Sequence, residues 1–278
     1  MKAMGLHLEI ERAGDGAPWI VFGNSLLTDL SLWDEVVRPL GRRFNLLRYD
    51  QRGHGRSEVP LHPLAMAELG ADFIEVLDAA GVGRCLYVGL SMGVPTGLAA
   101  LARAPGRFGG LILVDGQAKS AATGAAFWQE RIALARADGM AALAEATVRR
   151  WLRPERLGTP MAERLGAMVA ATPLEGFVAA ASALKSYDES AVLGRIAVPT
   201  LLVAGAEDGA MPDTMRTMAA AIPKARFAAI ADAGRVPVFE RPDAFLATIA
   251  EALDAWERDG AAASLITASG AAAGEGRP

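Results

Sequence analysis

Short apolar runs recur along the chain, each bounded by glycine, aspartate or asparagine. Each run is too short for an independent helix and too apolar for a half-exposed strand, so each predicts a strand buried on both faces. The six runs are WIVFGN (19–24), FNLLRYD (44–50), RCLYVGLS (84–91), GLILVDG (110–116), PTLLVAGAED (199–208) and ARFAAIADAG (225–234). Helical stretches lie between most of them, including 66–81, 93–106 and 242–260. The alternation predicts an α/β fold with a mostly parallel, doubly wound sheet.

The alternation of strands and helices breaks between residues 120 and 194. This stretch is helical by pattern and contains no strand-like run. Because ligands of parallel sheets bind at the carboxyl ends of the strands, we expect an inserted all-helical cap over that edge. The predicted organisation is an α/β core at 1–119 and 195–258, a cap at 120–194, and a disordered tail at 259–278, where the residues are small and unpatterned.

Composition and charge narrow the possible partners. The chain has 278 residues, 22% of them charged, and a formal net charge of −4, so it offers no basic stripe for a phosphate backbone and no nucleic-acid partner is expected. No apolar run is long enough for a signal peptide or a membrane span, which predicts a water-soluble, cytoplasmic protein. Cys85 is the single cysteine, which excludes an intrachain disulfide. No metal-ligand spacing and no phosphate-binding loop is present, so neither a metal nor an organic cofactor is expected.

The five residues GLSMG (89–93) match the pattern G-x-S-x-G. They directly follow a predicted strand and directly precede a predicted helix, which is the context that a nucleophile elbow requires. The two glycines allow the backbone to turn sharply, so that Ser91 is lifted out of the sheet at the start of the helix. The segment therefore predicts a serine nucleophile at the carboxyl edge of the sheet.

Several further motifs occur in a familiar order, and with them the chain resembles the α/β-hydrolase family, more narrowly the 3-oxoadipate enol-lactonase group. The resemblance extends over about residues 5–255 and implies an α/β-hydrolase fold acting on small esters or lactones. The motifs are GNSLLTDLSLWD, LLRYDQRGHGRS, GLSMG, LEGFVAAASALKSYDES, PTLLVAGAEDGAMP and AGRVPVFERP. Lactonases, esterases and C–C hydrolases share most of them, so the resemblance specifies the fold more closely than the substrate.

The resemblance implies roles for individual residues. Ser91 matches the nucleophile and Asp208, in GAED, matches the acid of the catalytic triad. The backbone N–H groups of Leu26 and Met92 would form the oxyanion hole, which stabilises the charge of a tetrahedral intermediate. His54, in RGHGRS, matches a position that is architectural in the family.

Arg235 departs from the family pattern. The family's histidine belongs in AGH-x-P-x-x-E, and here Gly234, Pro237 and Glu240 are in register around an arginine. No histidine occurs after His62, so no neighbour can replace it. A guanidinium stays protonated in proteins and cannot accept the serine proton, so ordinary serine hydrolysis is predicted to be weak. We expect Arg235 to pair with Asp208 instead.

Four residues of the predicted cap are candidates to line the substrate pocket: Trp128, Arg131, Trp151 and Tyr187. Arg131 could hold a carboxylate of a small lactone; packing within the cap is the alternative for the two tryptophans, and a solvated helix face is the alternative for Arg131. Three functions remain open. The favoured one is a weakened or altered ester or lactone hydrolase; the others are a non-hydrolytic isomerase, cyclase or decarboxylase, and a binding or regulatory pseudoenzyme.

Overall fold

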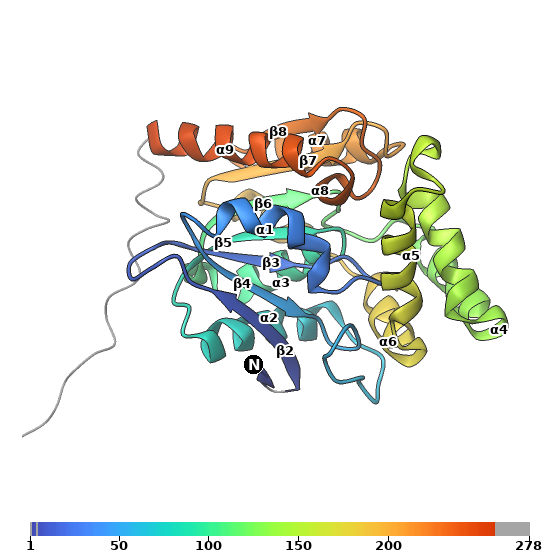
Figure 1. Cartoon of the computed structure of the whole chain (residues 1–278). Helices are drawn as coiled ribbons and strands as arrows, with labels where there is room; N and C mark the ends of the chain where they lie inside the picture. Colours follow the sequence, from blue (N-terminus) through green and yellow to red (C-terminus); the bar gives the residue numbers. More distant parts are fainter. Residues whose placement is uncertain (1, 4, 259–278) are drawn as a thin grey trace, which may run out of the picture.

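The apolar runs form the centre of an eight-stranded sheet in a computed structural model that describes residues 2–3 and 5–258 (Figure 1). Within these residues the strand order is β1-β2-β4-β3-β5-β6-β7-β8. β2 runs antiparallel to β1 and β4, and all the other pairs are parallel, which confirms the predicted fold class. The strands are β1 (Lys2–Ala3), β2 (Leu6–Glu11), β3 (Trp19–Gly23), β4 (Asn45–Asp50), β5 (Cys85–Leu90), β6 (Phe108–Val114), β7 (Thr200–Gly205) and β8 (Arg226–Ile230).

The two edges of the sheet differ from the pattern-based prediction. The expectation that the run 225–234 forms a strand buried on both faces is wrong, because β8 is the last strand of the sheet and most of its side chains are partly or fully exposed. At the other edge, β2 alternates buried and partly exposed residues and was not among the predicted strands. β8 has a neighbouring strand on one side only, and β2 has only the two-residue strand β1 on its outer side. Water therefore replaces part of the apolar packing around both strands.

Helices cover both faces of the sheet. On one face, α1 (Asp34–Leu40) and α9 (Pro242–Arg258) pack against alternate residues of the central strands. On the opposite face, α2 (Met66–Ala80), α3 (Gly93–Arg103) and α7 (Met211–Ala220) enclose a second apolar cluster. A short helix, α8 (Pro237–Glu240), precedes α9. The two clusters make the sheet the middle layer of a three-layer core.

Three further helices lie between β6 and β7 and stand together at one end of the sheet, on the right in Figure 1. They are α4 (Gly124–Trp151), α5 (Pro160–Ala171) and α6 (Leu174–Lys185). α4 bends at Gly139, where φ is 83° and ψ is 171°. The boundaries 1–119, 120–194 and 195–258 stay predictions, and the predicted tail at 259–278 lies outside the described residues.

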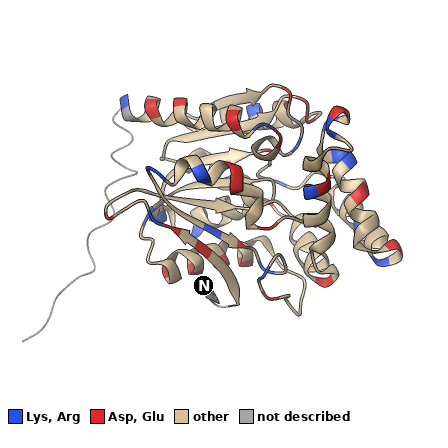
Figure 2. Cartoon of the chain, in the orientation of Figure 1, with Lys and Arg blue, Asp and Glu red and all other residues tan. Residues whose placement is uncertain are grey.

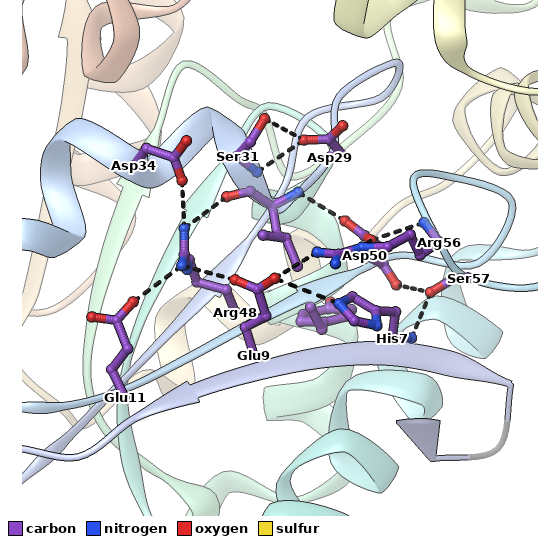
Figure 3. A network of polar contacts seen from close by, with 12 residues as sticks. His7, Glu9, Glu11, Asp29, Ser31, Asp34, Arg48, Asp50, Arg56 and Ser57 are labelled. Carbon is purple, nitrogen blue, oxygen red and sulfur yellow. Dashed lines mark hydrogen bonds and ion pairs between the residues drawn. The ribbon is translucent and has the colours of Figure 1, made fainter. Parts of the chain in front are cut away.

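The three helices α4, α5 and α6, called the cap below, are bound to the core by an ion pair and a hydrogen bond. Arg164 of α5 donates hydrogen bonds to the Asp34 carboxylate at 2.9 Å and to the carbonyl oxygen of Ser31 at 2.8 Å. The second oxygen of Asp34 accepts a hydrogen bond from Arg48 at 2.7 Å. Figure 3 shows Arg48 between Asp34 and two glutamates of β2. One buried guanidinium therefore connects β2, β4 and α1, and through Asp34 it connects them to the cap.

Within the described residues, no single helix is long and apolar enough to cross a membrane. The pair α5 and α6 meets the length and composition test only when taken together, and the two helices are bent by 94° at their junction.

Candidate active site

Ser91 lies in a sharp turn between β5 and α3. Its φ of 54° falls in the left-handed region, which a non-glycine residue adopts only under strain. Gly93 is required here because a Cβ at that position would lie 2.5 Å from the carbonyl oxygen of Gly23. A Cβ at Gly89 would likewise lie 2.7 Å from the carbonyl oxygen of Gly93. The GLSMG segment thus has the strand–turn–helix geometry of a nucleophile elbow.

The turn after β3 is anchored by the buried side chain of Asn24. Its amide nitrogen donates a hydrogen bond to the carbonyl oxygen of Tyr49 at 2.7 Å, and its amide oxygen accepts one from the indole of Trp33 at 2.8 Å. The Trp33 ring is itself fully buried, with its centre 4.9 Å from that of Phe22. The start of the turn is therefore held by the rigid interior of the core.

Among the described residues, the backbone N–H groups of Leu26 and Met92 have no hydrogen-bond acceptor, whereas the N–H of Leu27 has one. The N–H of Leu27 donates to Nε2 of His54 at 3.0 Å. The N–H groups of Leu26 and Met92 donate to no acceptor among the described residues. Leu26 and Met92 both line the same cavity as Ser91. These two donors therefore share a cavity with Ser91, and their role as an oxyanion hole stays a prediction.

His54 is fully buried and acts as an acceptor in this turn. Burial lowers the pKa of His54 from 6.5 to about 4, because the interior cannot solvate the charged ring. In the neutral ring, Nδ1–H faces the carbonyl oxygen of Arg52 at 3.2 Å and leaves Nε2 free to accept from Leu27. This arrangement supports the architectural role that the resemblance implies for His54.

A pH-dependent loss of stability follows from His54. Between pH 7 and pH 5 the unfolded chain takes up a proton at this ring and the folded chain does not, so acid favours unfolding. The stabilisation is complete above pH 6.5 and is lost as the pH falls towards 4. We expect the free energy of unfolding to fall by about 2 kcal/mol more than in His54→Gln over this range, as urea denaturation would measure. The exposed His62→Gln should retain the full dependence, and parallel curves for the parent chain and His54→Gln would contradict the assignment.

Arg235 and Asp208 meet at the ends of β8 and β7. Nη1 of Arg235 donates a hydrogen bond to Oδ2 of Asp208 at 3.1 Å. Only 18% of the arginine side chain and 16% of the aspartate side chain are exposed. The predicted pairing is confirmed, through one hydrogen bond rather than the bidentate contact that a guanidinium allows. The cation thus holds the acid where the resemblance implies an imidazole.

The backbone of the Arg235 loop is fastened to the end of α4. The N–H of Arg235 donates to the carbonyl oxygen of Trp151 at 3.0 Å. Beside it, the Glu240 carboxylate accepts hydrogen bonds from the N–H of Gly234 at 2.8 Å and from the N–H of Arg153 at 3.4 Å. Glu240 is only 3% exposed, and this burial raises its pKa. The position of Arg235 therefore depends on the seating of the cap.

Asp115, at the end of β6, is a buried carboxyl that the sequence analysis did not single out. It accepts a hydrogen bond from the N–H of Gly205 at 3.1 Å, and its φ is 40°. Burial, and secondarily the nearby charge of Asp208, raises the pKa of Asp115 well above its ordinary value. Burial thus disfavours the charged form of Asp115, which leaves Asp208 as the carboxylate that faces Arg235.

A cavity of about 270 Å³ opens above Ser91, between the carboxyl edge of the sheet and the cap. All four predicted pocket residues line it, so the alternative of a solvated helix face for Arg131 is wrong, while Trp151 is both a core residue and a wall of the cavity. Arg235 contributes to the floor beside Ser91. Residues that the sequence analysis did not predict include Leu27, Gln117, Phe127, Arg150, Leu184 and Met211.

Arg150 is the most consequential of the residues missed. It and Arg131 both stack near the Phe127 ring, with guanidinium carbons 4.3 and 5.5 Å from the ring centre. Burial, together with the nearby charges of Arg150 and Arg235, lowers the pKa of Arg131 to about 10. The only sequence signal is the pair of arginines in TVRRW, and an amphipathic helix face carries the same pattern whether it meets water or a cavity.

The cavity lining contains the Ser91 hydroxyl and the N–H groups of Leu26 and Met92 but, among its described residues, no ordinary base. Among the described residues that line it there is no histidine, aspartate, glutamate, lysine or cysteine. Burial raises the pKa of Tyr187 to about 12, so its phenol stays protonated at neutral pH. Within the same described part of the chain, no group of three or more His, Cys, Asp or Glu side chains is placed to hold a metal ion. A proton leaving Ser91 must therefore pass to water or to the ligand.

Known proteins share this architecture and much of the sequence. Residues 18–242 match the family described as the alpha/beta hydrolase fold. The chain is 33% identical over 193 residues to 3-oxoadipate enol-lactonase 2 of Acinetobacter baylyi, covering 69% of this chain and 72% of that protein. The crystal structure of the enol-lactonase from Burkholderia xenovorans LB400 is 35% identical with a TM-score of 0.85, covering 91% of this chain and 98% of the other. A hydrolase from Pseudomonas aeruginosa PA01 is 35% identical with a TM-score of 0.83, covering 89% and 94%.

Proposed function

The chain belongs to the alpha/beta hydrolase fold family, and from this premise we propose that it is a serine-type hydrolase of small carboxylic esters or lactones whose turnover is slow. One observation carries the proposal. Ser91 stands in a strained elbow, facing a cavity with the unpartnered N–H groups of Leu26 and Met92, while Arg235 occupies the base position and binds Asp208. The strained elbow and the two N–H groups favour acyl transfer, whereas the arginine at the base position limits its rate.

The proposed reaction proceeds in two steps. Oγ of Ser91 attacks the carbonyl carbon, its proton passes to water, and the N–H groups of Leu26 and Met92 hold the negative oxygen of the intermediate. The bond to the leaving oxygen breaks, and that oxygen takes a proton from water. A second water then attacks the acyl carbon and loses a proton to solvent, the bond between this carbon and Oγ of Ser91 breaks, and Oγ takes up a proton from water. Arg235 stays protonated throughout and contributes positive charge rather than proton transfer.

The substrate that we propose is a small lactone or ester that carries a carboxylate. A cavity of about 270 Å³ suits a small molecule. Arg131 lies in its wall, and its guanidinium donates one hydrogen bond, to the hydroxyl of Thr147, which leaves other N–H groups for a ligand. The enol-lactonase names of two relatives support a lactone as the acyl donor.

The test is hydrolysis of p-nitrophenyl acetate and of an enol-lactone by the parent chain and by Ser91→Ala. We expect the parent to exceed the uncatalysed rate by more than about 10³- to 10⁴-fold, which is the level that oxyanion stabilisation and binding supply by themselves without a working triad. Ser91→Ala should remove the part of this rate that passes through an acyl-enzyme. Ser182→Ala is the matched control, because the Ser182 hydroxyl bonds only within its own helix, to Val178. Equal rates for the parent and Ser91→Ala would show that Ser91 is not the nucleophile.

A second candidate function is the binding of a small anion without turnover. The specific observation in its favour is the group of three arginines that line the cavity. The same hydrolysis assay separates the two functions, because a binding protein would give no Ser91-dependent rate.

A further inference from the structure

The lining of the cavity carries more positive charge than the proposed hydrolysis requires. In the view of Figure 2, basic and acidic residues are interspersed over both core and cap. The described lining of the cavity differs, since it contains Arg131, Arg150 and Arg235 and no acidic residue. Asp208 reaches this group from behind, through its hydrogen bond to Arg235. Asp208 therefore forms an ion pair with one of the three guanidinium groups.

Two of the three cations, Arg131 and Arg150, form no ion pair within the described part of the chain. Arg131 donates a hydrogen bond to the uncharged hydroxyl of Thr147, and Arg150 stacks on Phe127. The adjacent Arg149, by contrast, pairs with Glu145 at 2.6 Å on the outside of the helix. Like charges held together in a partly desolvated site repel one another. Burial is the main cause that lowers the pKa of Arg150, and the charge of Arg235 lowers it as well, while the charge of Asp208 opposes the change.

We infer that the cavity binds small dianions, meaning molecules with two acidic groups such as short dicarboxylates, in preference to monoanions, and that Arg150 is the residue that determines this preference. The lining carries three guanidinium groups, and only Arg235 is in an ion pair, with Asp208. A dianion neutralises more of this positive charge than a monoanion does. The inference rests on the proposed function in that it concerns the same cavity.

The placement of the three arginines gives each acidic group its own partners. Arg235, Arg131 and Arg150 all line the cavity; Arg235 and Arg131 are partly buried, and Arg150 is exposed. A guanidinium can bind a carboxylate through two parallel hydrogen bonds, which favours arginine at such positions. A ligand with two acidic groups can therefore engage more than one of these arginines.

This preference also bears on the reaction. Hydrolysis of a lactone that already carries one carboxylate breaks the acyl–oxygen bond, adds water and creates a second carboxylate. The product is then a dianion while the substrate is a monoanion. The cavity would retain such a product more tightly than the substrate, so dicarboxylates are expected to inhibit turnover.

The test is calorimetric titration of the full chain carrying Ser91→Ala, which prevents turnover. Succinate, glutarate and adipate would be compared with butyrate, pentanoate and hexanoate at one fixed ionic strength, because salt screens the charges. We expect at least one dicarboxylate to bind about tenfold or more tightly than the monocarboxylate of equal length. Arg150→Gln should weaken that binding about tenfold and change monocarboxylate binding much less.

Arg149→Gln is the matched control, because it removes the same charge from the neighbouring residue but not from the cavity. Equal affinities for mono- and dicarboxylates, no binding of either, or equal losses in Arg149→Gln and Arg150→Gln would overturn the inference. The outcome is separable from that of the proposed function. Dicarboxylate binding without Ser91-dependent hydrolysis would support the inference alone, and hydrolysis without the preference would support the proposed function alone.

Discussion

Arg235→His is expected to raise the rate of ester or lactone hydrolysis by about 10³-fold. Imidazole accepts a proton near neutral pH and returns it to the leaving group, which guanidinium cannot do. Loss of the base from a serine triad costs on the order of 10⁴- to 10⁶-fold, and a histidine introduced into unadjusted surroundings should regain only part of that. The measurement is kcat/KM for p-nitrophenyl acetate and for an enol-lactone, in the parent chain and the variant.

Three control variants and a pH profile make this result specific. Ser91→Ala in the histidine variant should return the rate to background, and Asp208→Asn should remove most of the gain, because Asp208 would orient the new ring. The activity of the histidine variant should also rise with pH around 6.5, the ordinary pKa of histidine. Arg241→His, an exchange in the same region that leaves the cavity lining intact, should give no gain. An unchanged rate in Arg235→His would mean that the elbow does not present Ser91 to this position.

Gly205→Ala is expected to lower the free energy of unfolding by about 3 kcal/mol, near the upper end of ordinary overpacking. Gly205 ends β7, where a Cβ would lie 1.9 Å from the carbonyl oxygen of Gly234 and 2.6 Å from that of Ala233. Both obstacles are backbone atoms, so no side chain can move aside. The loop that carries Arg235 would have to shift away from β7 and from Asp208.

Gly194→Ala provides the comparison, because a Cβ at Gly194 meets no atom within 4 Å. Urea denaturation of the two variants and the parent would measure the difference. In the Arg235→His background, Gly205→Ala should also remove most of the gained activity, while Gly194→Ala should not. A destabilisation below about 1 kcal/mol by Gly205→Ala would show that β7 and the loop separate at little cost.

Local patterns predicted the central part of the fold. The runs at 19–24, 44–50, 84–91 and 110–116 became β3 to β6 because a strand buried on both faces must be apolar at successive positions. The edge strands were less predictable. β2 alternates, and β8 is partly exposed, since their environment depends on which strand lies next to them in space.

The same distinction holds for the candidate site. The elbow, the acid loop and the arginine in place of histidine are short contiguous segments, and a contiguous segment fixes its own local chemistry. Three features were not predicted: Asp115, Arg150 and the requirement for glycine at 205. Each depends on contacts with residues far away in the sequence. No local pattern distinguishes a helix arginine that faces water from one that faces a cavity.

The sequence by itself thus determined the fold family, the position of Ser91 and the absence of a base, because these follow from local periodicity and from residue type. Only the tertiary structure decided that the guanidinium groups of Arg131, Arg150 and Arg235 line one cavity, and that one of them, Arg235, is bonded to the carboxylate of Asp208. Convergence of this kind results from the packing of the cap on the carboxyl edge of the sheet. That packing is a sum of many long-range contacts, and it sets which charges meet.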